Sequence, residues 1–464
     1  MKSRGPMGKS VRGAARKNQL PAAIGQPADS ASAFIHDHRS APSQERLRFR
    51  EATQCRICGN PNLVKILDLG DQYLTGVFPS LRSPQVGSGP VELVKCMGDD
   101  PREFCGLVQM HHSFAAEDMY GDNYGYRSSL NRSMVDHLHR KADFLQNLAR
   151  IDSRDIVLDI GSNDGTSLAR YPAGGPTLVG IDPSARKFSK YYRSDIELII
   201  DFFSADLFRQ CFGDRKAKII TSIAMFYDLE QPQAFVDDVA AILADDGVWH
   251  LEQSYLPSML RTNSYDTACH EHIEYYTLRQ LDWMTQRAGL QIIDVQFNAI
   301  NGGSFAVTVG KQQGAAGEPP AAISRLLSDE AALGLDTLRP FEELHQRMLK
   351  HREELRAFLT RARQENKTVI GYGASTKGNV LLQFCGITPE LMPCIAEINE
   401  DKFGCVTPGT WIPIVPEQQA RDMNPDYFLV LPWHFRETII KRETAFLQRG
   451  GKLVFPLPKL EIVS

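Results

Sequence analysis

The chain has 464 residues, of which 42% are hydrophobic and 23% charged, and its formal net charge is −4. This length suits about two or three domains, and the composition is that of a soluble globular protein rather than a membrane-embedded or fully disordered one. The small negative charge favours neither a nucleic-acid nor a membrane partner, and we expect neither. No apolar run reaches the roughly 18 residues of a membrane span. The nine cysteines are unevenly spaced, so a cytoplasmic location without a disulfide framework is expected.

The N-terminal segment, residues 1–48, is predicted to be a disordered tail. Its first 28 residues carry six Lys or Arg, no acid, and many Gly, Ala and Pro. Such a segment buries too little apolar area to offset the entropy lost on ordering. A transit-like peptide and a mis-assigned start codon are the alternatives, and the weak amphipathic pattern favours a solvated tail.

Four cysteines between residues 51 and 115 predict a small zinc-binding lobe. Cys55 and Cys58 are two residues apart, a spacing at which both thiolates face one tetrahedral Zn²⁺. Cys96 and Cys105 are separated by eight residues, which is a weaker pattern, and buried thiols without metal are the alternative. Since four sulfurs complete the coordination shell, the ion is expected to be structural.

An α/β domain is predicted over residues 116–312. Short apolar runs alternate there with helical stretches, as the strands of a parallel sheet do. These runs are residues 156–160, 178–181, 219–223 and 248–252. Two further strands, 290–297 and 304–310, are joined through Asn301-Gly302-Gly303, which predicts an antiparallel hairpin. A parallel sheet ending in a hairpin fits the seven-stranded sheet of class I methyltransferases.

The sequence VLDIGSNDGT, Val157–Thr166, predicts the cofactor loop of this domain. It reads as a strand, a tight turn and a helix start capped by Asp164, and the glycines at 161 and 165 let a ligand approach the backbone. About 20 residues later the next strand ends at Asp182, where an acid holds the ribose of a nucleoside. The pattern G-x-N-D-G leaves less room for a pyrophosphate than G-x-G-x-x-G does. It resembles the S-adenosylmethionine-binding loop of class I methyltransferases.

Individual roles follow for the donor-binding residues. The methionyl part is expected to lie against Asp159, Gly161, Asn163 and Gly165, and the ribose against Asp182. Asp201 and Phe202 are candidates for the adenine, the acid for its amino group and the ring for its face. Taken alone, Phe202 and Phe203 are more typical of core residues, and an ordinary strand–helix turn is the alternative for the loop.

A possible acid–base site lies in Cys269–His272, CHEH, just before a helix predicted at Thr277–Ala288 with a capping box in its first turn. This places the segment at the loop edge of the sheet, where open α/β sheets bind ligands. Adjacent Glu271 and His272 form a pair whose pKa values a cleft can tune. The alternatives are a polar loop whose histidines cap helices, and metal binding through His270 and His272 without an evident third ligand.

Residues 323–464 are predicted to form linker helices and a second αβ domain, after a linker at 310–322. The second domain begins with a strand and the turn sequence GYGASTKG. There Gly373, Ser375 and Lys377 are predicted to hold a phosphate or pyrophosphate of the substrate. The glycine spacing is not the dinucleotide fingerprint, and a simple strand–helix turn with a surface lysine is the alternative.

Together these segments resemble one family, the sugar C-methyltransferases that act on nucleotide-linked 4-keto-6-deoxyhexoses. The resemblance covers Cys55 to the C-terminus through motifs in the same order: CRICG, CGLVQ, YGYRSS, LDIGSNDGT, DFF, CHEH, NGGS, GYGASTK, FCGI, PGTWIPI and GGKLVFPLP. It implies a zinc lobe, a class I methyltransferase core and a C-terminal Rossmann-like domain that helps hold the nucleotide sugar. It also implies S-adenosylmethionine as methyl donor.

The resemblance implies residue roles as well. His272 matches the family's base, Glu271 its neighbouring acid, and Tyr126 the aromatic residue that closes over the cofactor. The base is expected to remove a proton from C3, beside a C4 ketone, so that the resulting enolate attacks the sulfonium methyl group.

Departures from the family leave the substrate and the methylated atom open. Cys269 and His270 stand where known members have Tyr and Asp, and Tyr227 stands where a His is common, so Tyr227 is a candidate for polarising the ketone. The sequence also allows a methyltransferase for a different acceptor, an NAD-dependent oxidoreductase built on the second glycine loop, and a zinc-ribbon interaction module with a degenerate enzyme core. Nothing in the sequence indicates the oligomeric state.

Overall fold

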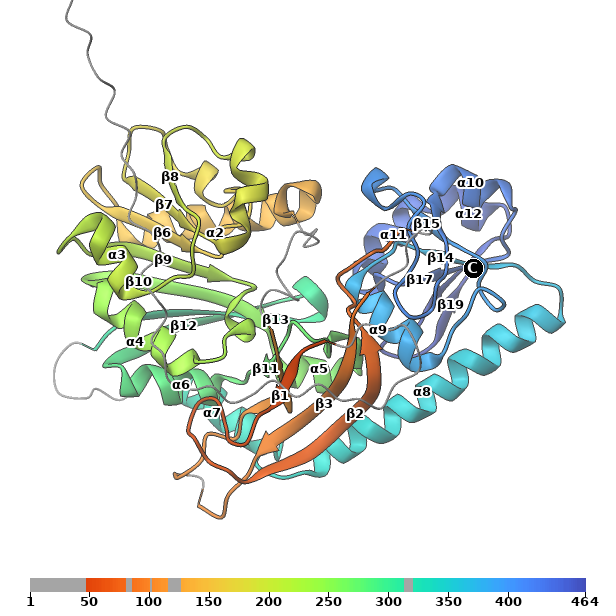
Figure 1. Ribbon diagram of the computed structural model, residues 1–464, viewed down its shortest axis with the longest axis horizontal. Helices are drawn as coiled ribbons and strands as arrows, with labels where there is room; N and C mark the ends of the chain where they lie inside the picture. The colour runs from red at the N-terminus through yellow and green to blue at the C-terminus, as the bar shows by residue number, and fades with distance from the viewer. Residues whose placement is uncertain (1–46, 81–85, 101, 116–126, 313–319) are drawn as a thin grey trace, which may run out of the picture. The chain divides into compact units, whose positions relative to one another are not determined.

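The computed structural model describes residues 47–80, 86–100, 102–115, 127–312 and 320–464, which all belong to one unit of the chain, Ile35–Ser464 (Figure 1). The tail predicted for residues 1–48 therefore lies, apart from its last two residues, outside the described part. Tyr126 also lies outside it.

In the described part of the chain, seven strands form the predicted methyltransferase sheet, in the order β12-β13-β10-β9-β6-β7-β8. Strands β6 to β10 pair in parallel, and β13 runs antiparallel to both β10 and β12. The predicted hairpin is thus confirmed, and the direction of winding reverses between β6 and β9, where such sheets bind ligands. The strands are β6 (Ile156–Ile160), β7 (Thr177–Ile181), β8 (Ile196–Ile199), β9 (Ala217–Ile223), β10 (Leu243–Ser254), β12 (Leu290–Asn298) and β13 (Ser304–Lys311).

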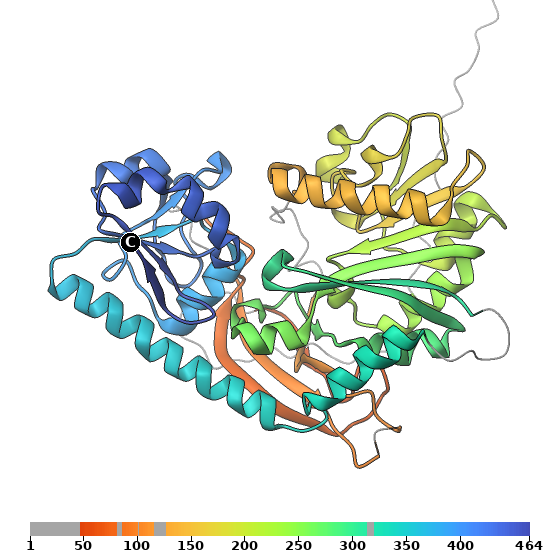
Figure 2. The same ribbon diagram turned by 180° about the vertical axis from the view of Figure 1, so that it is seen from behind.

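Helices cover both faces of this sheet. Helix α2 (Arg132–Ala149) crosses the face seen in Figure 2 and packs on β9 and β10. On the opposite face, seen in Figure 1, lie α3 (Ala205–Phe212) and α4 (Pro232–Ile242). Because both faces are covered, the central strands are largely buried, and every residue of β6 is buried. The remaining helices of this region are α5 (Leu256–Thr262), α6 (Leu278–Arg287), η1 (Ser128–Leu130), η3 (Pro183–Tyr191), η4 (Phe226–Asp228), η5 (Tyr265–Thr267) and η6 (Ile300–Gly302).

The helix predicted directly after the first glycine loop is not an α-helix. The chain makes a turn at Gly165, with φ of +74°, and then only a 3₁₀ helix, η2 (Leu168–Arg170). Two features account for this: Gly165 has a left-handed conformation, and Pro172 disfavours helical geometry at Tyr171. Asp164 still caps the turn, because its carboxylate accepts the N–H of Thr166 at 3.2 Å.

The cysteine-containing region forms an antiparallel sheet that is not made by this region alone. Among the described strands its order is β11-β4-β3-β2, and β11 (Glu274–Tyr275) comes from the segment directly after CHEH. The predicted lobe therefore shares its sheet with the chain that carries the candidate acid–base pair. The other strands are β2 (Leu63–Tyr73), β3 (Ser88–Cys96), β4 (Val108–Met110) and the separate pair β1 (Phe49–Glu51) and β5 (His112–Phe114).

A second nucleotide-type sheet follows in the C-terminal region. Its order across the described strands is β16-β15-β14-β17-β18-β19, all parallel except the last pair. In chain order this is 3-2-1-4-5-6, the Rossmann order, so the predicted Rossmann-like fold is present. The strands are β14 (Val369–Tyr372), β15 (Ile395–Glu397), β16 (Ile414–Pro416), β17 (Tyr427–Val430), β18 (Lys452–Phe455) and β19 (Glu461–Val463).

The helical stretch predicted at 323–365 consists of two helices, α7 (Ala321–Ala332) and α8 (Arg339–Gln364). Helix α8 buries an apolar stripe at helical spacing that includes Phe341, Leu344, Met348 and Leu355. It packs against β2 and α9. The remaining helices are α9 (Thr376–Cys385), α10 (Glu417–Asp422), α11 (Arg436–Arg442), α12 (Thr444–Gln448), η7 (Glu400–Lys402) and η8 (Trp433–Phe435).

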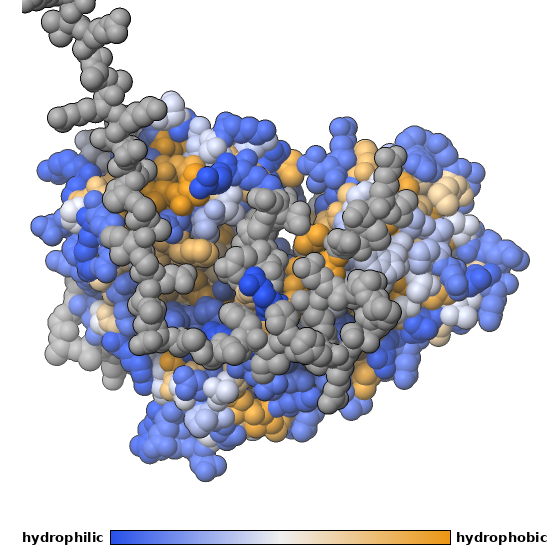
Figure 3. Space-filling model, viewed as in Figure 1, coloured by the Kyte–Doolittle hydropathy of each residue, from blue (hydrophilic) through white to orange (hydrophobic). Residues whose placement is uncertain are grey.

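The surface agrees with the composition. On the face shown in Figure 3, hydrophilic residues occupy most of the outer margin. Within the described residues, no helix is both long and apolar enough to cross a membrane.

Candidate active site

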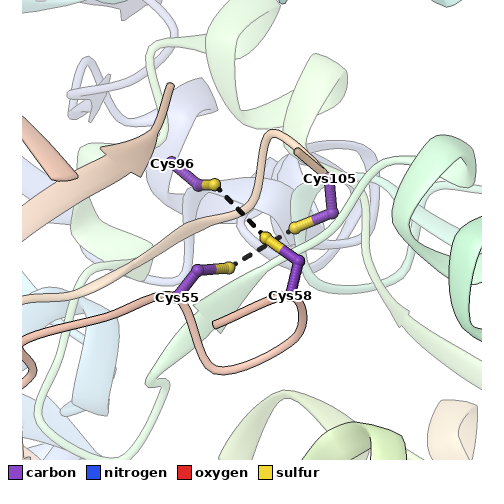
Figure 4. Close-up of side chains that lie close together, drawn as sticks. All are labelled: Cys55, Cys58, Cys96 and Cys105. Atoms are coloured by element: carbon purple, nitrogen blue, oxygen red, sulfur yellow. Dashed lines mark hydrogen bonds between the residues drawn. The ribbon is translucent and has the colours of Figure 1, made fainter. Parts of the chain in front are cut away.

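The four predicted cysteine ligands meet at one point (Figure 4). Their sulfur atoms lie within 4.8 Å of one another, with Cys55 Sγ 3.4 Å from Cys105 Sγ and Cys58 Sγ 3.6 Å from Cys96 Sγ. Tetrahedral zinc with bonds of about 2.3 Å places its sulfurs roughly 3.8 Å apart, so the cluster fits the ion. The eight residues between Cys96 and Cys105 do not keep the two thiols apart. Cys96 ends β3, Cys105 precedes β4, and these two strands pair with each other.

Local backbone geometry supports the zinc site. Gly59, with φ of +71°, donates its N–H to the carbonyl of Cys55 at 2.9 Å and closes the turn that brings the first two thiols together. The amide of Asn60 donates to Cys96 Sγ at 3.4 Å, a contact of the kind that orients a metal ligand. Hydrogen bonding to Cys105 lowers the pKa of Cys96, whereas burial raises the pKa of Cys105 itself. The other five cysteines are scattered, as expected.

The first glycine loop and the acid after the next strand are in direct contact. Asp182 is 5% exposed, and its Oδ2 accepts the N–H of Asn163 at 2.8 Å. Its Oδ1 accepts the N–H and hydroxyl of Ser184, both at 2.7 Å. Gly161 and Asn163 have φ of +74° and +50°, and a Cβ on Gly161 would lie 2.9 Å from the side chain of Met225. The glycine is thus required by backbone conformation and by packing.

Asp159, which is predicted to contact the methionyl group of the donor, is a buried residue of the sheet. It is buried within β6, where the hydroxyl of Thr221 on β9 donates to its Oδ1 at 2.5 Å. Burial raises the pKa of Asp159 to about 7. The structure therefore shows a contact between two strands at this residue, and its contact with the donor stays a prediction.

The loop also holds the chain that follows Tyr126. The N–H of Ser128 donates to Asn163 Oδ1, and the N–H of Ser129 donates to Asp164 Oδ2, each at 3.0 Å. Ser128 and Ser129, at the end of the YGYRSS motif, are 35 residues from their partners in the glycine loop but adjacent to them in the fold. These two serines had no predicted role, and only their place in the motif distinguished them.

The two phenylalanines of the predicted adenine segment differ in burial. Phe202 is 62% exposed, so its assignment to the core is wrong, and its face is open to a flat ligand. Phe203 does pack inward, with its ring centroid 5.2 Å from that of Phe235. The reason is that β8 ends at Ile199, so residues 201–203 form a connection to α3 at the edge of the sheet. Asp201 is exposed and accepts the N–H of Phe202 at 2.7 Å.

Two of the three candidate acid–base residues, Tyr227 and His272, are in contact, whereas the Oε1 of Glu271 lies beside Gly76. The rings of Tyr227 and His272 have centroids 4.4 Å apart, and the carbonyl of Tyr227 accepts the N–H of Ile273 at 3.0 Å. Burial, assisted by the positive charge of Lys377, lowers the pKa of His272 to about 4. Burial raises the pKa of Glu271, whose buried Oε2 has no hydrogen-bond partner among the described residues.

The tautomer of His272 follows from one hydrogen bond. Its Nδ1 lies 3.1 Å from the carbonyl oxygen of Thr267. A carbonyl only accepts, so Nδ1 carries the proton and Nε2 keeps its lone pair. His270, by contrast, donates from Nε2 to the carbonyl of Gly89 in β3 at 3.1 Å and meets the ring of Phe114 edge-on. The two histidines of CHEH therefore have different partners, and His270 supports the zinc lobe.

The polar groups of the second glycine loop form hydrogen bonds with other residues of the protein. Ser375 caps α9 by accepting the N–H of Gly378 at 3.1 Å, and Gly373 has φ of +77° against Pro432. Lys377 is half-buried rather than on the surface, and its ammonium donates to the carbonyl of Asn301 in the β12–β13 hairpin. The phosphate contacts of Gly373, Ser375 and Lys377 stay a prediction.

Sequence reasoning missed an acid beside this loop. Glu397 ends β15, and its Oε2 accepts the N–H of Ala374 at 2.8 Å. It occupies the position in the second sheet that Asp182 occupies in the first. The sequence does carry a signal for it, because Glu397, like Asp182, is an acid at the end of the strand that follows a glycine loop.

The first sheet and its glycine loop define an S-adenosylmethionine-dependent methyltransferase of class I. Family models match three consecutive parts of the chain: a putative zinc binding domain over residues 55–120, a methyltransferase domain over 128–295, and a C-methyltransferase C-terminal domain over 299–458. The protein is therefore an S-adenosylmethionine-dependent methyltransferase that is similar, part by part, to C-methyltransferases with a zinc-binding domain.

The chain is also similar to individual known proteins. The chain is 28% identical over 418 residues to the C-methyltransferase NovU of Streptomyces niveus, covering 89% of this chain and 98% of NovU. Among solved structures it is similar to a Haloferax volcanii putative methyltransferase complexed with the Trm112 activator (14% identity, TM-score 0.31, 39% of this chain and 95% of the other). It is also similar to the CcbJ methyltransferase of Streptomyces caelestis (13% identity, TM-score 0.31, 38% and 90%). The class assignment rests on strand order and family models rather than on these low TM-scores.

Proposed function

We propose that the protein transfers a methyl group from S-adenosylmethionine to C3 of a nucleotide-linked 4-keto-6-deoxy sugar. The observation that carries the proposal is the geometry of His272, whose Nδ1–H is held by the carbonyl of Thr267. The Nε2 lone pair is then a base, and methylation at carbon requires a base to remove a proton. The similarity to a C-methyltransferase over most of the chain supports methylation at carbon.

The donor site of this proposal consists of the first glycine loop, Asp182 and the exposed ring of Phe202. When bound, S-adenosylmethionine supplies an electrophilic methyl group on a positively charged sulfur. Asp182 directly follows β7 at the ligand-binding edge of the sheet, which supports its proposed role as an acceptor for ribose hydroxyls. The second, Rossmann-ordered sheet provides a separate loop for the nucleotide of the sugar.

The chain's own residues then perform the proton transfer. His272 Nε2 takes the C3 proton, and the electron pair of that bond becomes the enolate, with negative charge on the C4 oxygen. In this proposal Tyr227, whose ring lies against that of His272, donates a hydrogen bond from its hydroxyl to this oxygen. Glu271 contributes its Oε2, which is unpartnered in the described part of the chain, as an acceptor for a sugar hydroxyl. A positioned base contributes about 10²–10⁴ in rate.

The reaction class and the acceptor are tested together by product analysis. A panel of nucleotide-linked 4-keto-6-deoxy sugars, incubated with isotope-labelled donor, is expected to give a product that carries one added methyl group. NMR should place that group on C3, and mild acid should not release it. Matched 4-hydroxy sugars are the control, because they cannot form the enolate. Methylation of an oxygen, or no product with any keto sugar, would overturn the proposal.

The pH dependence of the reaction tests the base. Since burial and the charge of Lys377 hold the pKa of His272 at about 4, the imidazole is neutral and active at all higher pH values. The rate constant for methyl transfer at saturating substrates is therefore expected to show no protonation step between pH 5 and 7. An ordinary histidine would lose activity on acidification through about pH 6.5. A step at that pH in the wild-type profile would contradict the assignment.

Lys377→Met should move the acid limb of this profile to higher pH, because it removes a charge that disfavours protonated His272. Lys350→Met, on the exposed side of α8, is the matched control and should leave the profile unchanged.

A further inference from the structure

The turn η5 (Tyr265–Thr267), which precedes His272, is anchored by residues of the C-terminal region. Tyr265 is fully buried, and its hydroxyl lies 2.8 Å from Nδ1 of His351 on α8 and 3.5 Å from Sγ of Cys385 on α9. Although η5 belongs to the segment matched by the methyltransferase domain model, its side chains bond outside that segment.

The central residue of the turn has the closest polar contact with that region. Asp266 is 1% exposed, and its Oδ2 accepts the indole N–H of Trp433 at 2.7 Å. Trp433 is itself 6% exposed. Neither group has access to water as a replacement partner, so loss of this bond leaves a buried polar group unsatisfied.

The surroundings of Trp433 show that its ring has a fitted position. A Cβ on Gly302, which has φ of +91°, would lie 3.3 Å from the indole ring. The glycine of the NGGS hairpin therefore leaves space for the ring. Beside it, the ammonium of Lys377 donates to the carbonyl of Asn301. The indole is thus placed by packing on one side and by Asp266 on the other.

The residue after Asp266 holds the candidate base. The carbonyl of Thr267 accepts Nδ1–H of His272, and this bond sets both the tautomer and the direction of Nε2. A displacement of the turn by a fraction of an ångström changes the position of that carbonyl and hence of the imidazole. The chain of contacts runs from Trp433 through Asp266 and Thr267 to His272.

We propose that Trp433 is a positioning residue for His272, so that the C-terminal region sets the geometry of proton removal as well as contributing to substrate binding. This inference rests on the proposed role of His272 as the base. Trp433 acts through the turn and need not contact the sugar. A purely structural role, in contrast, would change the stability of the protein but not selectively the step in which the proton is removed.

The test measures that step directly. In D₂O, with the demethylated donor S-adenosylhomocysteine bound, NMR follows exchange of the C3 hydrogen of the keto sugar for deuterium. Trp433→Phe keeps a buried ring but loses the N–H donor, and it is expected to slow this exchange and kcat alike, by up to about 10²-fold. KM for the sugar and the calorimetric affinity for S-adenosylmethionine should stay near the wild-type values. Trp283→Phe on α6, whose ring contacts Arg287, is the matched control and should not change the exchange.

Variants at the other end of the bond make the same test independent of how Trp433→Phe folds. Asp266→Asn keeps an oxygen acceptor and should retain most of the exchange rate, whereas Asp266→Leu, which branches at the same carbon but is larger and has no acceptor, should lose it. Equal exchange rates in wild type, Trp433→Phe and Asp266→Leu would overturn the positioning role while leaving the proposed reaction intact. Absence of both exchange and methyl transfer in the wild type would overturn the proposed function itself.

Discussion

Removal of zinc is expected to unfold the N-terminal lobe and to abolish methyl transfer. Structural zinc sites of this kind contribute roughly 10–16 kcal/mol in apparent binding free energy, which equals or exceeds the whole stability of a typical domain, about 5–15 kcal/mol. The effect should reach the active site because β11, directly after the candidate base, is a strand of the lobe's sheet. His270 adds a second connection through the carbonyl of Gly89.

Cys58→Ser is the variant that tests this. It should lower the zinc content measured by atomic emission, and lower both the thermal unfolding temperature and the methyl-transfer rate. Cys211→Ser is the matched control, since Cys211 is exposed and outside the cluster. Stoichiometric zinc with unchanged stability in Cys58→Ser would show that the four sulfurs are not the ligand set. Treatment of the wild type with a strong chelator should reproduce the effect of Cys58→Ser.

His272→Asn is expected to reduce methyl transfer by about 10²–10⁴-fold. The amide roughly matches the size and hydrogen-bonding capacity of the imidazole but cannot act as a base, so the fold and the donor site should persist. Rate constants with the keto sugar measure the loss, and calorimetry with S-adenosylmethionine checks that donor binding is retained. His345→Asn on α8 is the matched control. A variant with full activity would remove His272 from the role of base.

The elements that the sequence predicted well are those encoded locally. Apolar runs of about five residues predicted the strands around β6, and three consecutive turn residues predicted the hairpin. Both predictions succeeded because strand and turn preferences act over short distances along the chain. The zinc ligands were predicted for a similar reason, since two thiols at two-residue spacing have few competing arrangements. The order of the strands was not predicted, because it depends on pairing between segments that are distant in sequence.

The features that were missed depend on contacts between distant segments. The bond from Trp433 to Asp266 joins residues 167 positions apart, and nothing near either residue indicates the partner. The addition of β11 to the lobe's sheet is of the same kind. The helix predicted after the first glycine loop is only the short η2, and the reason is local. The left-handed conformation of Gly165 and the presence of Pro172 prevent a longer helix, although Asp164 caps the turn. The contacts of the proposed donor and substrate residues remain predictions.

The hydrogen bonds that hold Asp182 have a consequence for the energetics of donor binding. Its Oδ2 accepts one hydrogen bond from Asn163 and its Oδ1 accepts two from Ser184, whereas a carboxylate offers about four acceptor sites. The carboxylate is therefore oriented before the donor arrives, and a ribose hydroxyl that bonds to it should bind without the cost of ordering this side chain. Dehydration of the adenine and thioether surfaces should add to the affinity, with a negative heat-capacity change as its calorimetric mark.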